Sequence, residues 1–206
     1  WLMSSRADAS RPWNWYSQRE CGGGVLGALG THAFDMLAWL IGPINSIQAV
    51  NHVSIKERPH PDGTMATVDA EDVSLIQTTL NWQGQCDHLI PAQVSLSSVA
   101  RNGRGCWIEV YGSDGTLRLG SSNQKDYVHG FGLWYGGGNE TLRAVSPDPD
   151  LVFHSTWSDG RIAPVARIQD WWAESIRSGT PMVPGLAEGL ASQMACDQSI
   201  NSSAHW

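Results

Sequence analysis

The order of hydrophobic patterns along the chain restricts its fold more than any other feature. Apolar residues recur every three or four positions over residues 26–41, which is the pattern of a buried helix. Gly42 and Pro43 then end this helix, because glycine caps a helix end and proline cannot continue one. Two further helices are predicted near the end of the chain, over residues 163–178 and from about Leu186 onward.

Between these helices the chain alternates between apolar and polar residues, as half-buried strands do. Strands are predicted at residues 47–55, 73–82, 92–100, 106–111 and 116–119, with two weaker ones within 127–135 and 141–145. Residues 58–69, which are rich in proline and glycine, are predicted to form a loop, and Gly112 to Gly115 a hairpin connection. This order indicates the α+β class: an open, mostly antiparallel β-sheet with helices packed on one face. No repeat or linker divides the pattern, so residues 1–206 are expected to form a single domain.

The charge balance argues against a nucleic-acid partner. The chain has 13 basic and 20 acidic residues, a formal charge of −7, and no basic stripe. The longest apolar run, residues 33–41, is too short to span a bilayer, and no signal peptide opens the chain. We therefore expect a cytoplasmic protein without membrane contact.

The cysteines are expected to be reduced thiols. They are widely spaced and include no C-x-x-C pair, which argues against a disulfide scaffold and against a zinc site. They are Cys21, Cys86, Cys106 and Cys196. The sequence Cys86-Asp87-His88 is interpreted as part of a strand region and not as a ligand set, so no metal site is predicted.

No segment has the pattern of a dinucleotide-binding turn. Such a turn follows a buried strand, carries G-x-G-x-x-G and leads into a helix. Residues 136–138 are three glycines that lead into another extended stretch, and residues 22–24 are three glycines with no buried strand before them. We therefore assign no residue of this chain to cofactor binding.

The first helix carries the most informative polar residues. Ala28, His32 and Asp35 lie four and three positions apart, so they share one helix face. The Asp35 carboxylate is predicted to contact His32 and to fix its tautomer. Gly27 and Gly30 inside the helix indicate close approach of another backbone or of a ligand. Spacing alone leaves two interpretations open: a structural histidine, or a group that transfers protons near neutral pH.

Three ordered motifs resemble the C-terminal domain of the Gfo/Idh/MocA oxidoreductases, the family of glucose-fructose oxidoreductase and myo-inositol dehydrogenase. The first motif is a glycine run followed by G-x-H-x-x-D and an apolar turn that ends in glycine. Its residues are Gly22 to Gly24, Gly30, His32, Asp35 and Gly42. The second resembles the strand-turn-strand I-E-x-x-G-x-x-G-x-L and covers residues 108–117. The third resembles the closing helices and covers residues 176–181 with Gly189 and Asp197.

The resemblance implies a function and a site. In that family an N-terminal Rossmann domain, absent from this chain, binds NAD or NADP and supplies a lysine, while the C-terminal domain supplies a proton-transferring histidine. By position this histidine is His32, and Thr31, Asp35 and Gly24 are predicted to bind substrate. Family members often carry an aspartate four residues before the histidine, but Ala28 stands there in this chain. The implied function is NAD(P)-dependent oxidation or reduction of a sugar, a polyol or a similar hydroxylated molecule. The isolated chain is expected to be inactive and to form homo-oligomers through its β-sheet.

Two alternative functions stay open because Ala28 cannot carry a proton. One is a ligand-binding or dimerisation module without chemistry, and the other is glycoside cleavage with recycled NAD. Trp171 and Trp172 are predicted to pack the helix at 163–178 against the sheet, and one or two of the 11 tryptophans are candidates for stacking on carbohydrate. Arg101 and Arg104 are weaker candidates for substrate contact, as is Trp134.

Overall fold

The chain forms two compact units in the computed structural model, which describes residues 1–82, 87–123 and 130–202. The first unit contains residues 1–103 together with the segment from Val183 onward, and the second contains residues 104–182. The sequence gives no sign of this division, because no linker-like stretch lies at either boundary. That residues 1–206 form a single domain therefore stays a prediction.

An antiparallel three-stranded sheet forms the centre of the first unit. Its strands are β1 (Ile44–His52), β4 (Val73–Asn81) and β5 (Leu89–Ser97), in the order β1-β4-β5. Ala49 pairs with Ile76, and Ile76 pairs with Val94, so these side chains point to the same face of the sheet. The beginning of the chain lies along the free edge of β5, where Leu2 forms a parallel bridge with Ser97.

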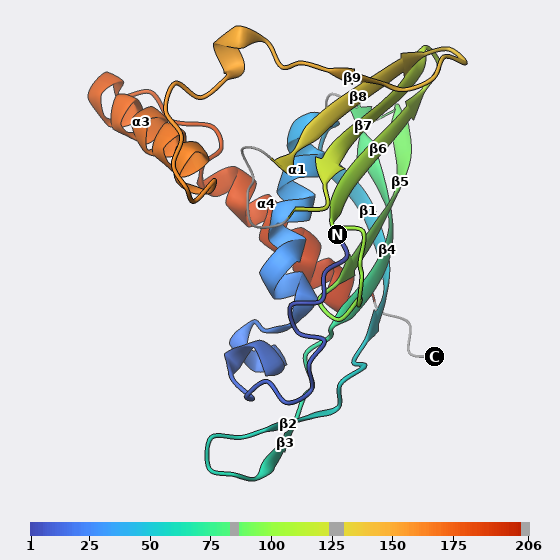
Figure 1. The fold of residues 1–206 in the computed structure, drawn as a ribbon, viewed down its shortest axis with the longest axis vertical. Coiled ribbons are helices and arrows are strands. Elements are labelled where there is room, and N and C mark those ends of the chain that lie inside the picture. Colours follow the sequence, from blue (N-terminus) through green and yellow to red (C-terminus); the bar gives the residue numbers. More distant parts are fainter. Residues whose placement is uncertain (83–86, 124–129, 203–206) are drawn as a thin grey trace. The chain divides into compact units, whose positions relative to one another are not determined.

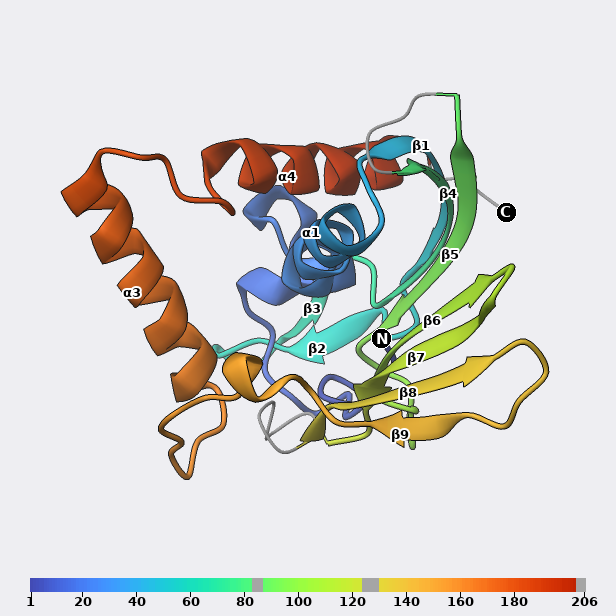
Figure 2. The same ribbon diagram turned by 90° about the horizontal axis from the view of Figure 1, so that it is seen from above.

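The helices of this unit cover one face of that sheet (Figures 1 and 2). They are η3 (Leu26–Gly30), a π-helical turn, α1 (Thr31–Leu40) and α4 (Leu186–Asn201). The buried core between helices and sheet consists of Val25, Leu26, Ala33, Phe34, Ala49, Ile76, Leu96, Ala195 and Cys196. The α+β class and the placement of helices on one face of an open antiparallel sheet are thus confirmed.

Two local features of the first unit differ from the prediction. The strand predicted to reach residue 55 ends at His52. The buried Asp72 carboxylate accepts hydrogen bonds from the backbone N–H groups of Ser54 and Ile55, at 2.8 and 3.0 Å, and so holds this segment out of the sheet. The predicted loop at 58–69 is instead a short hairpin. Its strands are β2 (Glu57–Pro59) and β3 (Met65–Thr67). Elsewhere in this unit, two 3-10 turns precede the first helix, η1 (Trp15–Ser17) and η2 (Arg19–Cys21).

The second unit carries an antiparallel meander. Its strands are β6 (Cys106–Gly112), β7 (Gly115–Ser121), β8 (Gly132–Gly137) and β9 (Arg143–Val145), paired in chain order. Gly112 pairs with Gly115, which confirms the predicted hairpin. Part of the strand predicted within 127–135 lies outside the described residues, as does Cys86.

The meander is followed by η5 (Pro149–Leu151) and α3 (Ile162–Ser178), which ends at Gly179 in the left-handed conformation, as predicted. Trp171 and Trp172, predicted to pack this helix against the sheet, are 49% and 61% exposed and are not buried against the strands of their own unit. Ala163 is the one residue of α3 that is buried. The described residues of the second unit therefore leave the apolar face of this helix exposed.

Candidate functional site

A buried carboxylate holds the beginning of the helix that carries His32. The helical segment starts at Gly24, and Glu71 reaches it from the residues just before β4. The Leu26 N–H donates to the Glu71 carboxylate at 3.0 Å, and the Val25 N–H donates to the Glu71 backbone carbonyl at 2.7 Å. Glu71 is only 2% exposed, and burial raises the pKa of its carboxyl.

The next turn of this helix is wider than an α-helical turn. Residues 26–30 form the π-helical η3, and the Cys196 thiol of α4 donates to the Leu26 carbonyl at 3.6 Å. A Cβ atom on Gly30 would lie 2.9 Å from the Cys196 sulfur, and one on Gly27 would overlap the Gly22 carbonyl. The close approach predicted at both glycines is thus made by the chain itself. π-helical turns inside α-helices occur frequently at functional sites.

His32 follows this turn as the second residue of α1, and its side chain is exposed. The ring of Trp1 lies nearby, with 6.4 Å between the ring centroids. Thr31 and Asp35 are half-buried on the same helix. The predicted contact between His32 and Asp35 does not form, since these two described side chains share neither a hydrogen bond nor an ion pair. An imidazole accessible at the head of a helix can exchange a proton with a bound hydroxyl group.

Gly24 has a different environment from the one expected of a substrate-binding residue. It has a φ of +89°, is buried, and packs directly on the Glu71 carboxylate, so that a Cβ atom would lie 2.8 Å from the Glu71 Cδ. Glycine is required here by the backbone conformation and by this contact. Sequence reasoning missed Glu71, because a single glutamate 45 positions from its partner has no local pattern.

The glycine-rich segments do not fit a dinucleotide. Residues 22–24 follow the 3-10 turn η2 and not a strand, and residues 136–138 lead from β8 towards β9. Neither forms the strand-turn-helix cradle that holds a pyrophosphate. Within residues 1–82, 87–123 and 130–202, no three His, Cys, Asp or Glu side chains lie close enough together to hold a metal ion.

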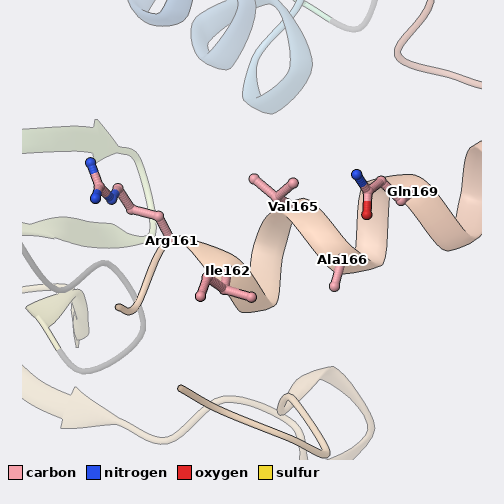
Figure 3. Close-up of a pocket in the computed structure, with 5 residues that line it drawn as sticks. All are labelled: Arg161, Ile162, Val165, Ala166 and Gln169. Carbon is pink, nitrogen blue, oxygen red and sulfur yellow. The ribbon is translucent and has the colours of Figure 1, made fainter. Parts of the chain in front are cut away.

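A shallow depression lies on α3 and contains none of the predicted site residues (Figure 3). It is lined by Arg161, Ile162, Val165, Ala166 and Gln169. Its wall is mostly apolar and belongs to a single helix, so it lacks the convergent polar groups of a small-molecule site. Among the described helices, none combines the length and the apolar character needed to cross a membrane.

Comparison with known proteins connects this geometry to a family. Residues 2–205 match the family model described as "Oxidoreductase family, C-terminal alpha/beta domain" of the Gfo/Idh/MocA proteins. An uncharacterized oxidoreductase (sll0816) of Synechocystis sp. is 43% identical over 210 residues, which cover 100% of this chain and 55% of that protein. A levoglucosan dehydrogenase of Pseudarthrobacter phenanthrenivorans is 36% identical over 64 residues, which cover 31% of this chain and 16% of that protein.

A solved structure shares the fold. Levoglucosan dehydrogenase in complex with NADH and levoglucosan superposes with a TM-score of 0.79 at 19% identity, covering 98% of this chain and 54% of that one. The chain thus spans about half the length of the relatives that it matches over its full extent. The chain belongs to the Gfo/Idh/MocA oxidoreductase family and corresponds to its C-terminal alpha/beta domain.

Proposed function

We propose that this chain is the substrate-binding and catalytic part of an NAD(P)-dependent oxidoreductase that acts on a sugar, a polyol or a similar hydroxylated small molecule. The observation that carries the proposal is His32, exposed at the head of α1 within the family's own motif. Relatives named levoglucosan dehydrogenase, one of them solved with NADH and a sugar, support a sugar-like substrate and an NAD-type cofactor. The choice between NAD and NADP depends on residues outside this chain.

In this proposal His32 accepts the proton of the substrate, and the cofactor supplies the acceptor for the hydride. When the substrate alcohol is oxidised, its O–H proton passes to the His32 imidazole as the carbon becomes a carbonyl. A nicotinamide cofactor, when bound by another part of the protein, would supply the acceptor for the hydride that leaves this carbon. Thr31 and Asp35, half-buried beside His32, orient the substrate by hydrogen bonds. Gly24, which is buried against Glu71, is proposed to contribute to the substrate site by fixing the backbone at the beginning of this helix.

Ala28 leaves His32 without the carboxylate four residues before it that the family resemblance implies. Where relatives carry an aspartate, the methyl group of Ala28 neither accepts nor donates a proton. We therefore infer that His32 exchanges its proton with solvent or with a group of the partner domain. Its exposed position supports direct exchange with water.

Trp1 is the candidate for contact with the apolar face of a sugar. Its ring lies 6.4 Å from that of His32 and is tilted by 50° to it. Backbone hydrogen bonds to Ser97 on both sides of Leu2 hold this segment against β5, at 2.9 Å each. An aromatic ring fixed in this way offers a rigid apolar surface beside a polar group, as in many small-molecule sites.

The nucleotide-binding domain is proposed to cover the apolar face of α3. This face exposes Ile162, Val165, Ile168, Trp172 and Ile176, and the relatives are long enough to contain a second domain. An exposed apolar surface of this kind marks an interaction site. Amide hydrogen exchange along α3 can be compared between this chain alone and a polypeptide that carries both domains. Slower exchange in the longer polypeptide would support the placement, and equal rates would contradict it.

Assembly and location are also proposals. Exposed apolar side chains on the strands, such as Leu75 of β4 and Tyr111 of β6, support a homo-oligomer formed through the sheets. Three described cysteines, Cys21, Cys106 and Cys196, are free thiols, which supports a cytoplasmic location. The isolated chain is proposed to be inactive, because neither of its described glycine-rich segments, at 22–24 and 136–138, forms a cradle for the dinucleotide.

Two variants test the role of His32 in a polypeptide that also carries the nucleotide-binding domain. His32→Ala should lower the rate of nicotinamide reduction by about 100- to 10,000-fold, the usual contribution of a general acid–base group. The matched control is His60→Ala, since His60 lies in the β2–β3 hairpin and pairs with Asp62. Wild-type turnover by the His32→Ala variant would exclude the proposed role. A protein that binds cofactor and sugar but never turns over would favour the binding-module alternative, and product release without net NADH would favour glycoside cleavage.

A further inference from the structure

Among the described residues, Glu71 is the buried carboxylate that contacts the beginning of the helix of the proposed site. It is 2% exposed, and it contacts three successive residues at the beginning of the helix: Gly24, Val25 and Leu26. The first N–H groups of a helix have no partner within the helix, so a side chain that accepts from them fixes where the helix starts. Here that side chain comes from a segment 45 residues further along the chain.

We propose that Glu71 is a positioning residue for His32, acting through the turn that separates them. This inference rests on the proposed function of His32. Residues 26–30 form the π-helical η3, which ends immediately before Thr31 and His32. Glu71 holds the first residue of this turn through the Leu26 N–H, and Cys196 of α4 holds the same residue through its carbonyl and packs on Gly30.

The π-helical turn explains why this attachment matters for the histidine. A π-helical turn is rare and local, because its hydrogen bonds span one residue more than those of an α-helix. When its start is released, the same residues can adopt an ordinary α-helical turn, which rotates every side chain that follows. The direction of the His32 imidazole then depends on whether Leu26 stays fixed. Glu71 holds Leu26 by a hydrogen bond that a shorter side chain cannot reach.

Asp72 provides a matched control in the adjacent position. It is also buried, with 4% exposure, but its carboxylate accepts from the N–H groups of Ser54 and Ile55. These residues follow β1 and carry none of the proposed site. An Asp72→Asn substitution therefore perturbs a neighbouring buried carboxylate of the same kind without releasing the helix that carries His32.

The first test needs no activity and uses the 206-residue chain itself. The NMR resonances of the His32 imidazole, assigned with a His32→Gln variant, are compared in Glu71→Ala, Glu71→Asp, Glu71→Gln and Asp72→Asn. We expect them to shift in the Ala and Asp variants and to stay near their wild-type positions in Glu71→Gln, which keeps an oxygen acceptor of the same length, and in Asp72→Asn. The Asp variant keeps the test decisive if the Ala variant does not fold. Unchanged His32 resonances in Glu71→Asp, or an equal shift in Asp72→Asn, would overturn the proposal.

The second test is a double-mutant cycle in the polypeptide that carries both domains. Glu71→Asp should lower kcat by about 10- to 100-fold with little change in KM, the range expected when a catalytic group is misplaced by about an ångström. In a His32→Ala background the same substitution should have no further effect, because the group that it positions is gone. An equal fall in kcat in the wild-type and His32→Ala backgrounds would show that Glu71 has a structural role only. If His32→Ala is fully active, the proposed function fails, while the NMR comparison still decides whether Glu71 positions the histidine.

Discussion

Replacement of Gly24 by alanine tests the packing at the beginning of the helix that carries His32. Gly24 has a φ of +89°, and a residue with a Cβ atom in this region costs about 1–3 kcal/mol. The new Cβ atom would also lie 2.8 Å from the Glu71 Cδ. Because the buried Glu71 carboxylate is held by Leu26, the clash adds about 1–3 kcal/mol of overpacking. We expect Gly24→Ala to lower the free energy of unfolding by about 4 kcal/mol in total.

Gly22→Ala is the matched control in the same segment. Gly22 also has a positive φ, +70°, but a Cβ atom there would meet nothing within 4 Å. Gly22→Ala should therefore lower the free energy of unfolding only by the backbone share, about 1–3 kcal/mol, without the added cost of overpacking. Urea unfolding of the wild-type chain and both variants, followed by circular dichroism, measures the difference. Equal losses for Gly24→Ala and Gly22→Ala would refute the argument that contact with Glu71 requires glycine at this position.

Three further predictions concern the core, the pH dependence and the thiols. Phe34→Ala removes a fully buried ring of α1 and should lower the free energy of unfolding by about 3–5 kcal/mol in the same assay. Burial raises the pKa of Glu71 above its usual 4.5, so the folded state holds this proton more tightly than the unfolded state does. The free energy of unfolding of the wild-type chain should therefore fall relative to that of Glu71→Gln as the pH rises from about 4.5 through the raised pKa. A difference between the two free energies that stays constant in urea titrations at several pH values would contradict this. Burial raises the pKa of Cys196 to about 12, so in the native chain at pH 8 an alkylating reagent should modify the exposed Cys21 and spare Cys196; peptide mass spectrometry that finds Cys196 modified as fast as Cys21 would disprove this.

The elements with local patterns could be predicted from the sequence. The Gly42-Pro43 stop, the hairpin at Gly112 to Gly115 and the helix end at Gly179 all appear where turn and cap chemistry places them. The apolar stripe of the first helix also identifies its buried face, which includes Phe34. Each of these signals is contained within a few neighbouring residues, and for this reason a single sequence is sufficient.

The features that depend on distant contacts could not be predicted. The end of β1 is set by Asp72, and the start of the first helix is set by Glu71; both carboxylates act on segments far from them in the sequence. The π-helical turn has the same apolar spacing as an α-helix over so few residues, so periodicity cannot distinguish the two. The exposed face of α3 has the pattern of a buried stripe, and the sequence does not say which surface covers it.

For the site, the motif located His32 but not its surroundings. The predicted partner Asp35 does not contact His32. The ring of Trp1, 31 positions earlier in the sequence, lies beside it instead. Periodicity places residues on a helix face, but side-chain contact also depends on rotamers and on neighbouring segments. This is why Glu71 and Trp1 became visible only in the three-dimensional structure.

The most direct test of the central claim is the absorbance of nicotinamide in a polypeptide that carries this chain together with its nucleotide-binding domain. The protein, with NAD or NADP, is mixed in turn with a panel of sugars and polyols that includes levoglucosan. The account predicts a rise at about 340 nm, the signal of reduced nicotinamide, with at least one of them, and its loss in the His32→Ala variant. Demonstrated cofactor binding without any absorbance change across the panel, or an undiminished rise in the His32→Ala variant, would contradict it.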